Sequence, residues 1–278
     1  MEKISVIICS KNEELRIKNC LKSVLANKPD EIILVDGGST DNTVEIAKQY
    51  VSTIINSSNS NLTKDRQIGL DRSKNNYAAM IDCDHILEPN QLNDLLNEMT
   101  TNNYAIIQAQ IKILNKDFWT RAENFALRIT EVPGLQKQML GTAPAIYNCK
   151  LLKNISFDSH ITETIDDTDY FYRLSKLKKR FGTAHTMIKC HHEPGIANYI
   201  KKFLWYGKGD AEFGYKHKSR VKNIIFHLLI RYPIINFMKA ILLLRADTAL
   251  FFFLQGMTRF LSFAVNYTKL IKLNNKFF

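Results

Sequence analysis

The chain has 278 residues, of which 45% are hydrophobic and 23% are charged. This composition excludes global disorder, and the length permits one large domain or two small ones. The net charge of +11 is unevenly placed, because residues 1–172 contain 18 Lys+Arg against 23 Asp+Glu, whereas residues 173–278 contain 20 against 4. A C-terminal part with a net charge of +16 indicates a polyanionic partner, either nucleic acid or an anionic membrane surface.

The five cysteines are widely spaced and form no C-x-x-C pair. An odd number of this kind favours free thiols in a reducing compartment over a disulfide framework. The first residues, MEKISVIICSKNEE, form a short apolar run that soon becomes charged, which is not typical of a signal peptide. We therefore expect the active part of the chain to be cytoplasmic.

Strands and helices alternate along the first part of the chain. Short apolar runs rich in β-branched residues predict strands, and apolar residues at helical spacing predict helices. We expect strands at 4–9, 31–36, 52–55, 77–82 and 104–111, and helices at 13–25, 41–50, 62–73 and 91–99. This order predicts βαβ units and an α/β fold with a mostly parallel central sheet, whose ligands bind outside the carboxyl ends of the strands.

The elements after residue 117 are less regular in sequence. We expect a helix after Phe118, a turn at Pro133-Gly134 and a strand in GTAPAIYN. A further helix is expected over Asp169–Arg180, ended by Gly182, and a strand over Thr186–Cys190.

The tail after about Asn223 is very apolar but contains scattered basic residues. The longest uncharged span in its second half, Thr248–Thr258, is shorter than the roughly 18–20 residues that a spanning helix requires. Basic residues among aromatic and aliphatic ones favour helices that lie in the membrane interface. A buried helical subdomain, an oligomer interface and true membrane spanning are the alternatives. We expect a catalytic domain over 1–222 and a basic, apolar helical tail over 223–278.

Three of the expected strands end in polar clusters. These clusters are Ser10-Lys11-Asn12-Glu13, Asp36-Gly37-Gly38-Ser39 and Asp82-Cys83-Asp84-His85. Because the carboxyl ends of parallel strands meet at one edge of a sheet, the recurrence predicts a ligand site at that edge.

The pair Asp82 and Asp84 predicts a metal site within this edge. Side chains at i and i+2 of a regular strand point the same way, so both carboxylates can reach one cation. Mg²⁺ and Mn²⁺ prefer such oxygen ligands, commonly together with substrate phosphates. The alternative is a solvated strand end. If the strand continues, His85 points to the opposite face from Asp84.

A third cluster, Thr162-Glu-Thr-Ile-Asp-Asp-Thr-Asp169, places four acids in seven residues before and inside a helix start. Helix capping and the helix dipole favour acids there. Four acids exceed the need of one cap, and a helix N-terminus holds a carboxylate rigidly enough to act as a general base.

Taken together, these motifs resemble the family-2 glycosyltransferases of the GT-A fold, which are inverting enzymes that use nucleotide sugars. The resemblance covers about residues 3–210 and rests on five motifs in the family's order. They are SVIICSKNEE, EIILVDGGSTDNT, TKDRQIGLDRS (with Gln67 where Asn is usual), MIDCD, and IDDTDYFYRL (with Asp166 where Glu is common). Gly37 stands where many relatives carry a second acid, so the nucleotide base stays open.

The resemblance implies a role for each matching position. The residues that would bind the nucleotide sugar are Ser10, Asn12, Glu13, Asp36, Gly38, Ser39, Arg66 and Asp82. Asp84, joined by His191, would bind a divalent metal (Mn²⁺ or Mg²⁺), and Asp167 would be the general base. The acceptor or phosphate side would comprise Asp166, Lys202 and Trp205, within a basic and aromatic segment that resembles the family's. A core histidine and a solvated helix face are the alternatives for His191 and the lysines.

The implied activity is metal-dependent transfer of a sugar from a nucleotide-diphosphate sugar to a lipid-linked or growing saccharide acceptor. We expect the enzyme to be bound peripherally to the inner face of the cell membrane and to bind no nucleic acid. One alternative is a sugar nucleotidyltransferase, although SKNEE replaces the Gly-rich basic loop usual after its first strand. Another is a non-enzymatic polyanion-binding protein that uses the basic tail. The sequence leaves the sugar, the nucleotide and the oligomeric state open.

Overall fold

The structure is a computed structural model, and it describes residues 2–274 except 59, 135, 138–139 and 162–163. The strands are β1 (Ile4–Ser10), β2 (Glu31–Asp36), β3 (Thr53–Asn56), β4 (Tyr77–Met80), β5 (His85–Ile86), β6 (Ile106–Ile113), β7 (Gln136–Lys137), β8 (Ala145–Asn148) and β9 (Phe181–Cys190). The α-helices are α1 (Ile17–Ala26), α2 (Thr43–Ala47), α3 (Leu62–Arg72), α4 (Gln91–Thr101), α5 (Phe118–Thr130), α6 (Cys149–Leu152), α7 (Asp166–Ser175), α8 (Ile196–Lys216), α9 (Val221–Phe226), α10 (Phe237–Leu242) and α11 (Ala246–Asn274). Between α8 and α10 lie a 3₁₀ turn, η1 (Lys218–Arg220), and a π-helical stretch, η2 (His227–Asn236).

The chain forms two compact units. The first unit comprises Met1–Lys112, Val132–His160 and Asp167–His191. The second unit comprises Ile113–Glu131, Ile161–Asp166 and His192–Phe278. The helices after residue 223 thus share a unit with α5 and α8, and the expected domain boundary at 222/223 stays a prediction.

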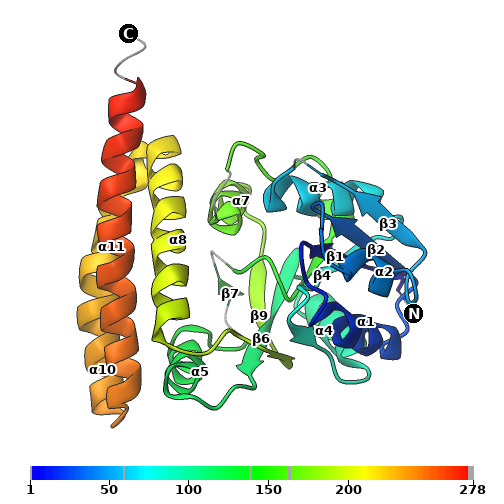
Figure 1. Cartoon of the computed structure of the whole chain (residues 1–278), viewed down its shortest axis with the longest axis horizontal. Helices are drawn as coiled ribbons and strands as arrows, with labels where there is room; N and C mark the ends of the chain where they lie inside the picture. The colour runs from blue at the N-terminus through cyan, green and yellow to red at the C-terminus, as the bar shows by residue number, and fades with distance from the viewer. Residues whose placement is uncertain (1, 59, 135, 138–139, 162–163, 275–278) are drawn as a thin grey trace. The chain divides into compact units, whose positions relative to one another are not determined.

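The first unit is built on one mixed sheet, visible in blue to green in Figure 1. Its strand order is β3-β2-β1-β4-β8-β6-β9-β5, with β7 paired to β9. The pairs β3–β2, β2–β1 and β1–β4 are parallel, and β8 pairs antiparallel to both β4 and β6. The expected α/β fold is confirmed, and the parallel arrangement holds for its first four strands. Ser10 is paired with Asp36 in register, so the ends of β1 and β2 lie together as expected.

Close packing of α3 against β1 explains one glycine of the TKDRQIGLDRS motif. A Cβ at Gly69 would lie 2.3 Å from the Cγ2 of Ile7, a separation that side chains do not tolerate. Because Ile7 is only 1% exposed in the core of the sheet, Gly69 lets the helix that carries Arg66 lie directly on the strand.

Several expected element boundaries are wrong. Helix α1 begins at Ile17 rather than residue 13, because the N–H groups of Arg16 and Ile17 both donate to the carbonyl of Glu13 and form a turn there. Helix α7 ends at Ser175, and β9 begins at Phe181. Gly182 is therefore inside the strand, where a Cβ would lie 2.3 Å from the ring of Tyr104. A packing requirement, and not a helix end, accounts for this glycine.

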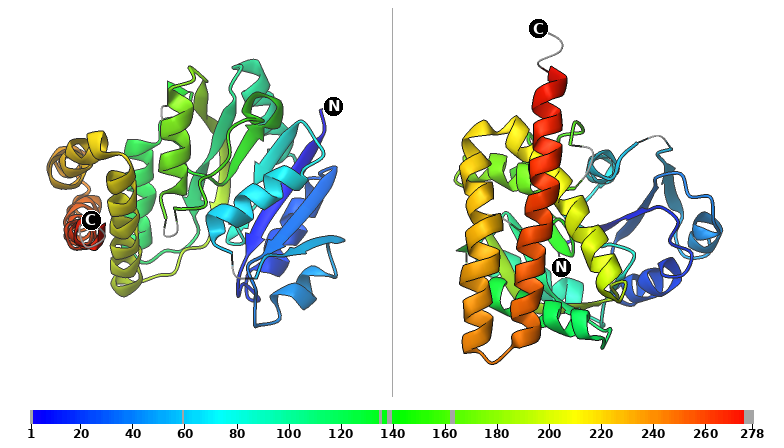
Figure 2. Two further views of the ribbon diagram at one scale, coloured as in Figure 1. Left: turned by 90° about the horizontal axis from the view of Figure 1, so that it is seen from above. Right: turned by 60° about the vertical axis from the view of Figure 1, so that its left-hand side comes forward.

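The second unit is helical. Figure 2 shows α11 running between α8 and the helix formed by η2 and α10. A buried cluster joins α11 to α5 and α8 and contains Ala122, Ala126, Tyr199, Phe203, Ala240, Ala249, Phe251 and Phe252. One polar contact between α8 and α11 is a bidentate ion pair in which Arg259 donates to Asp210 over 2.9 and 3.0 Å. The apolar tail is thus part of a folded helical unit.

Two helices in this unit, Lys218–Leu242 and Ala246–Leu273, are long and apolar enough to cross a membrane. Each has a mean hydropathy of 1.4 over its best window, and only 28% and 39% of those windows are buried. Length and composition therefore permit spanning, and the expected contact with the membrane interface stays a prediction. Arg259, one of the charges that interrupt the apolar sequence, is paired with Asp210 inside the unit.

Candidate active site

The loop after β1 and the loop after β2 interlock through side chains at the sheet edge. The side-chain oxygen of Asn12 accepts the N–H of Thr40 at 2.8 Å, and the N–H of Asn12 donates to the hydroxyl of Ser39 at 2.9 Å. Asn12 has a φ of 56°, a left-handed conformation that asparagine tolerates better than most residues. The structure therefore brings together the predicted nucleotide-binding residues of these two strand ends.

Asp36 is the buried centre of this loop pair, with 3% exposure. One carboxylate oxygen accepts the N–H groups of Gly38 and Ser39 at 3.1 and 2.9 Å. The other accepts the hydroxyls of Ser39 and Ser10 at 2.5 and 3.2 Å. Since a carboxylate offers about four lone-pair sites, these four hydrogen bonds occupy the acceptor sites of Asp36. The geometry indicates that Asp36 shapes the loop, and its contact with a nucleotide stays a prediction.

A carboxylate from another element lies beside Gly37. A Cβ at Gly37 would lie 3.2 Å from the Oδ2 of Asp65, a residue of α3 that is 5% exposed and accepts a hydrogen bond from Ser60. An acid at position 37 would place two carboxylates against each other. Asp65 has no sequence signal, because only the fold shows that α3 reaches this loop.

Glu13 links the first two strand ends to the third electrostatically. Burial raises the pKa of the Glu13 carboxyl, and although the Arg16 guanidinium opposes the shift, the Asp84 and Asp82 carboxylates raise it further. The carboxylates of Asp82 and Asp84 thus act on Glu13 electrostatically, and acids gathered in this way attract a cation.

The Asp82–His85 segment is a turn and not a continuing strand. Strand β4 ends at Met80, and the N–H of His85 donates to the carbonyl of Asp82 at 3.0 Å. The turn folds the imidazole back, so that Nε2 of His85 lies 3.7 Å from Oδ1 of Asp84. The expectation that His85 points away from Asp84 is wrong, because strand alternation stops at residue 80.

Asp82, Asp84 and His85 form the metal-compatible cluster of the described residues, with one ligand atom from each all within 4.8 Å of one another. The Nδ1 of His85 accepts the N–H of Asp82 at 3.0 Å, so the neutral imidazole carries its proton on Nε2, facing Asp84. His85 therefore supports the turn and the Asp84 carboxylate. The two carboxylates remain as hard oxygen donors, which fit Mg²⁺ or Mn²⁺.

Arg66 and His191 both lie at this turn. A terminal nitrogen of Arg66 is 3.9 Å from Oδ1 of Asp82, and Arg66 is 8% exposed. The N–H of His191 donates to the carbonyl of Asp84 at 3.1 Å. His191 itself is exposed. The predicted metal and phosphate residues of the first unit are thus adjacent, and ligation by His191 stays a prediction.

The predicted base lies in the first turn of α7. The Oδ1 of Asp167 accepts the N–H of Thr168 at 2.5 Å. Asp169 is fully buried and accepts from the Nε of Arg173 at 2.8 Å, so this acid has a structural partner. Asp166 is 5% exposed, and Glu163 lies outside the described residues. The roles of Asp166 and Asp167 stay predictions.

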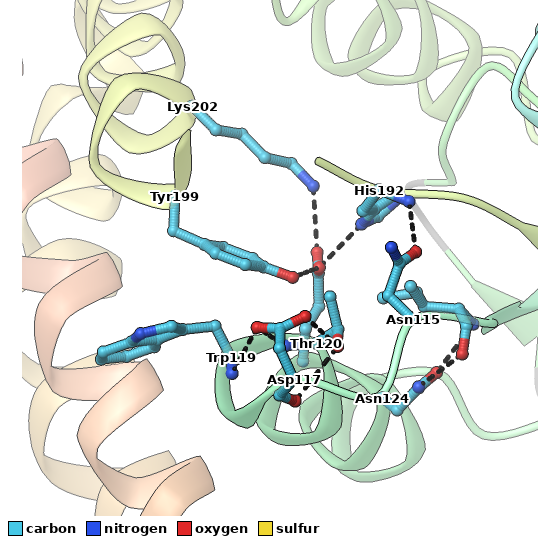
Figure 3. Close-up of polar contacts among 10 residues, drawn as sticks. Asn115, Asp117, Trp119, Thr120, Asn124, His192, Tyr199 and Lys202 are labelled. Atoms are coloured by element: carbon cyan, nitrogen blue, oxygen red, sulfur yellow. Dashed lines mark hydrogen bonds and ion pairs between the residues drawn. The ribbon is translucent and has the colours of Figure 1, made fainter. Parts of the chain in front are cut away.

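Lys202 belongs to a buried polar cluster in the second unit. Figure 3 shows Lys202, Tyr199 and His192 pointing toward one another. The carboxylate of Glu123 accepts from Lys202 Nζ at 3.0 Å, from the Tyr199 hydroxyl at 2.6 Å and from His192 Nδ1 at 2.8 Å. Trp205, three residues later, is 40% exposed and stacks on Tyr206 at 5.7 Å between ring centroids.

The ionisation of Glu123 is strongly favoured in this cluster. Burial alone would raise the pKa of Glu123, but the Lys202 ammonium and the hydrogen bonds of His192 and Tyr199 hold it well below its usual range. No sequence motif indicates this cluster, because Glu123 is an isolated acid within the helical segment FWTRAENFALRI.

The sequence is similar to that of known proteins. A sequence model described as glycosyl transferase family 2 matches residues 5–160, more than half of the chain. A 120-residue segment is 33% identical to the cholesterol galactosyltransferase of Borreliella burgdorferi and covers 40% of this chain and 33% of that enzyme. A 55-residue segment is 51% identical to an uncharacterized glycosyltransferase of Rickettsia typhi and covers 20% of this chain and 18% of that protein. The matches thus span a third or less of these relatives.

Solved structures share the fold. The crystal structure of residues 1–349 of S. aureus TarS aligns with a TM-score of 0.56 and 17% identity, over 82% of this chain and 75% of that one. The same protein in complex with UDP-GlcNAc gives a TM-score of 0.55, 18% identity, and coverage of 82% and 76%. Glucosyl-3-phosphoglycerate synthase from Mycobacterium tuberculosis, in complex with Mg²⁺ and UDP, gives 0.50 at 18% identity, over 69% of this chain and 73% of that one. The predicted GT-A fold is confirmed.

Proposed function

This chain belongs to glycosyl transferase family 2, and we propose that it moves a sugar from a nucleotide-diphosphate sugar, with inversion, to a lipid-linked or growing saccharide acceptor. The observation that carries the proposal is the turn at the end of β4, where Asp82 and Asp84 converge beside Arg66 and Glu13. Structures of the same fold support a donor of this chemistry, because TarS was solved with UDP-GlcNAc and the mycobacterial synthase with UDP and Mg²⁺.

The donor would lie along the edge formed by the ends of β1, β2 and β4. Residues of the β1 and β2 loops would surround the nucleoside, with Asp82 toward the ribose and Arg66 toward the base or phosphates. Asp84, joined by His191, would hold Mg²⁺ or Mn²⁺. When bound, such an ion neutralises the negative charge that builds on the departing diphosphate without any proton transfer.

Asp167 is our proposed general base. Its carboxylate takes the proton of the acceptor hydroxyl while that oxygen forms a bond to the anomeric carbon. On the opposite face, the bond from the anomeric carbon to the diphosphate oxygen breaks, and its electron pair leaves with the nucleoside diphosphate. Attack from the face opposite the leaving group inverts the configuration. Placement of the carboxylate at the start of α7 supports this role, because the helix fixes its direction.

Asp166, Lys202 and Trp205 are proposed for the acceptor or phosphate side. The exposed indole of Trp205, backed by Tyr206, offers an apolar face of the kind on which a sugar ring can lie. Lys202 is held by Glu123, so its ammonium has a fixed position rather than the freedom of a solvated lysine.

We also propose that the enzyme works at the cytoplasmic face of the cell membrane, bound peripherally through the second unit. The two apolar helices support membrane association, since most of their residues are not buried within the protein. Free cysteines fit a reducing compartment, and the net charge of +16 over residues 173–278 fits an anionic lipid surface.

A thermal-shift panel identifies the donor. The unfolding temperature is measured with UDP, GDP, CDP and ADP and with their common sugar derivatives, each with and without Mn²⁺. A ligand that binds only the folded state stabilises it by mass action, by about 2.7 kcal/mol at one hundred times its dissociation constant. We expect one nucleotide series to raise the unfolding temperature, more strongly with Mn²⁺. A panel in which no nucleotide shifts the transition would refute the proposed donor site.

A further inference from the structure

The turn between α10 and α11 exposes a run of aliphatic side chains. Ile241, Leu242, Leu243 and Leu244 are 39%, 77%, 55% and 92% exposed, and we call Ile241–Leu244 the hairpin tip. In Figure 2 this turn lies at the end of the helical hairpin opposite the C-terminus. Four consecutive exposed apolar residues are unusual on a soluble surface unless they have a function.

The backbone of the hairpin tip gives no reason for leucine. The N–H of Leu244 donates to the carbonyl of Ile241, and the N–H of Arg245 donates to the carbonyl of Ala240, both at 2.9 Å. This is the Schellman arrangement, whose left-handed residue is usually glycine. Here that residue is Leu244, with a φ of 57°. Leucine at this position is disfavoured by the conformation, and its 92% exposure leaves its side chain little packing within the chain.

The surroundings of the hairpin tip match a lipid bilayer. The N–H groups of Leu243, Leu244 and Arg245 donate to carbonyls of the preceding turn, so these donors do not oppose entry into an apolar medium. Lys239, two residues before the tip, is exposed, and residues 173–278 carry a net charge of +16. Apolar side chains flanked by cations fit acyl chains beneath anionic head groups.

Contacts within the second unit limit how much of the hairpin can be surrounded by lipid. Four residues after the tip, the hydroxyl of Thr248 donates to the carbonyl of Ala122 in α5. Farther along α11, Arg259 pairs with Asp210 of α8, and the hydroxyl of Ser262 donates to the carbonyl of Leu204. One side of α11 is therefore covered by helices of the same unit along much of its length. A conventional spanning helix would have to give up these contacts.

We propose that the hairpin tip inserts into the acyl-chain region of one leaflet of an anionic bilayer and holds the second unit on the membrane surface. The inference rests on the membrane association proposed above and names the residues responsible for it. The hairpin then enters lipid by its end and does not cross the bilayer.

Vesicle sedimentation of the full chain tests the proposal with the variant Leu242→Ser/Leu244→Gly. Vesicles of phosphatidylglycerol mixed with phosphatidylethanolamine are compared with vesicles of phosphatidylcholine. The glycine suits the Schellman turn, so we expect the unfolding temperature to be unchanged or higher. Loss of two inserted leucine side chains should weaken partitioning into the anionic vesicles by at least about tenfold. Leu15→Ser is the matched control, because Leu15 is 87% exposed in the first unit; it should bind vesicles like the wild type.

The outcomes separate the two proposals. A wild-type protein that does not sediment with either kind of vesicle overturns the membrane association itself. If the wild type binds and the double variant binds equally well, the association stands and the role of the tip is overturned. A dimer in the absence of lipid that the double variant converts to a monomer would show that a second copy covers the tip. Wild-type protein that resists alkaline extraction from vesicles would show spanning, which also contradicts the proposal.

Discussion

At the scale of single residues, two aspartates of α7 have different surroundings. Asp169 is fully buried and ion-paired with Arg173, whereas Asp167 is partly exposed at the helix start and accepts the N–H of the next residue. We expect Asp169→Asn to lower the free energy of unfolding by about 2 kcal/mol, since it removes the buried carboxylate that pairs with the half-buried Arg173.

The same substitution at Asp167 should leave the unfolding temperature unchanged. It should reduce kcat by about 10²–10⁴-fold, the usual contribution of a general base, while donor affinity is retained. Steady-state kinetics and calorimetric titration of the two variants give the comparison. An Asp167→Asn enzyme with full turnover would assign the base to another residue.

The Glu123 cluster makes stability depend on pH. Because the pKa of Glu123 is lowered in the folded protein from its ordinary value of 4.5, its stabilisation is fully present above pH 4.5 and is lost as the pH falls below it. Glu123→Gln should therefore destabilise the protein at neutral pH by about 2 kcal/mol. Chemical denaturation between pH 3 and pH 7 measures this effect. As the pH falls, the free energy of unfolding should decrease less in this variant than in the wild type.

Glu45→Gln is the control for that measurement. Glu45 pairs with Lys48 at 2.6 Å, but both side chains are more than half exposed, and such pairs contribute little. Its pH profile should match that of the wild type. A Glu123→Gln profile equally close to the wild type would show that the buried pair contributes no net stability.

Site residues can be predicted from the sequence where their position depends on neighbours in the chain, and not where it depends on contacts with distant segments. Asp82, Asp84 and the polar residues after β1 and β2 could be predicted, because strand ends in a parallel sheet share an edge. His85 was placed wrongly, since the turn that reverses its direction depends on a hydrogen bond between its ring and the Asp82 N–H. Asp65 and Glu123 have no sequence signal, because their partners are brought to them by other helices.

At the scale of elements, the contact of α3 with β1 depends on Gly69. Gly69→Ala places a methyl group against Ile7 and should lower the free energy of unfolding by about 1–3 kcal/mol through overpacking. Thermal unfolding measures the change. The matched control is Gly214→Ala in α8, where the nearest atom, the Cδ1 end of Ile224, would be 3.1 Å away and can move. Equal stability of both variants would contradict the packing argument.

Element types were predictable and element ends were not. The alternation of strands and helices through residue 111 appears in the structure, because hydrophobic spacing reports buried faces directly. The residues before α1 and after α7 have helical composition, but local turns end the helices there. At position 182 the glycine is required by the ring of Tyr104, a neighbour that is distant in sequence.

At the scale of the whole molecule, the C-terminal helices complete a core. Phe251 and Phe252 pack with Tyr199 and Phe203 of α8. Removal of residues 223–278 should therefore give an insoluble or unfolded second unit rather than a soluble enzyme released from membranes. Solubility and circular dichroism of the truncated chain give the answer. A soluble, cooperatively folding product would show that the tail is only an anchor.

The charge asymmetry predicted membrane contact but not its form. Composition shows that residues 173–278 are basic and apolar, whereas only the fold shows which apolar residues are covered by α5 and α8 and which remain exposed. Arg259 illustrates the difference, because it interrupts the apolar sequence yet is 12% exposed and paired in the structure.

The most direct test of the donor site is calorimetric titration of UDP, or of the nucleoside diphosphate that the thermal-shift panel selects, into the wild type and Asp84→Asn, with and without Mn²⁺. Asp94→Asn, an exposed change of the same chemistry, is the control. We expect Mn²⁺ to tighten binding by at least about tenfold in the wild type and in Asp94→Asn, and Asp84→Asn to lose this gain while unfolding at the same temperature. Equal Mn²⁺-dependent binding by Asp84→Asn and the wild type would contradict this expectation.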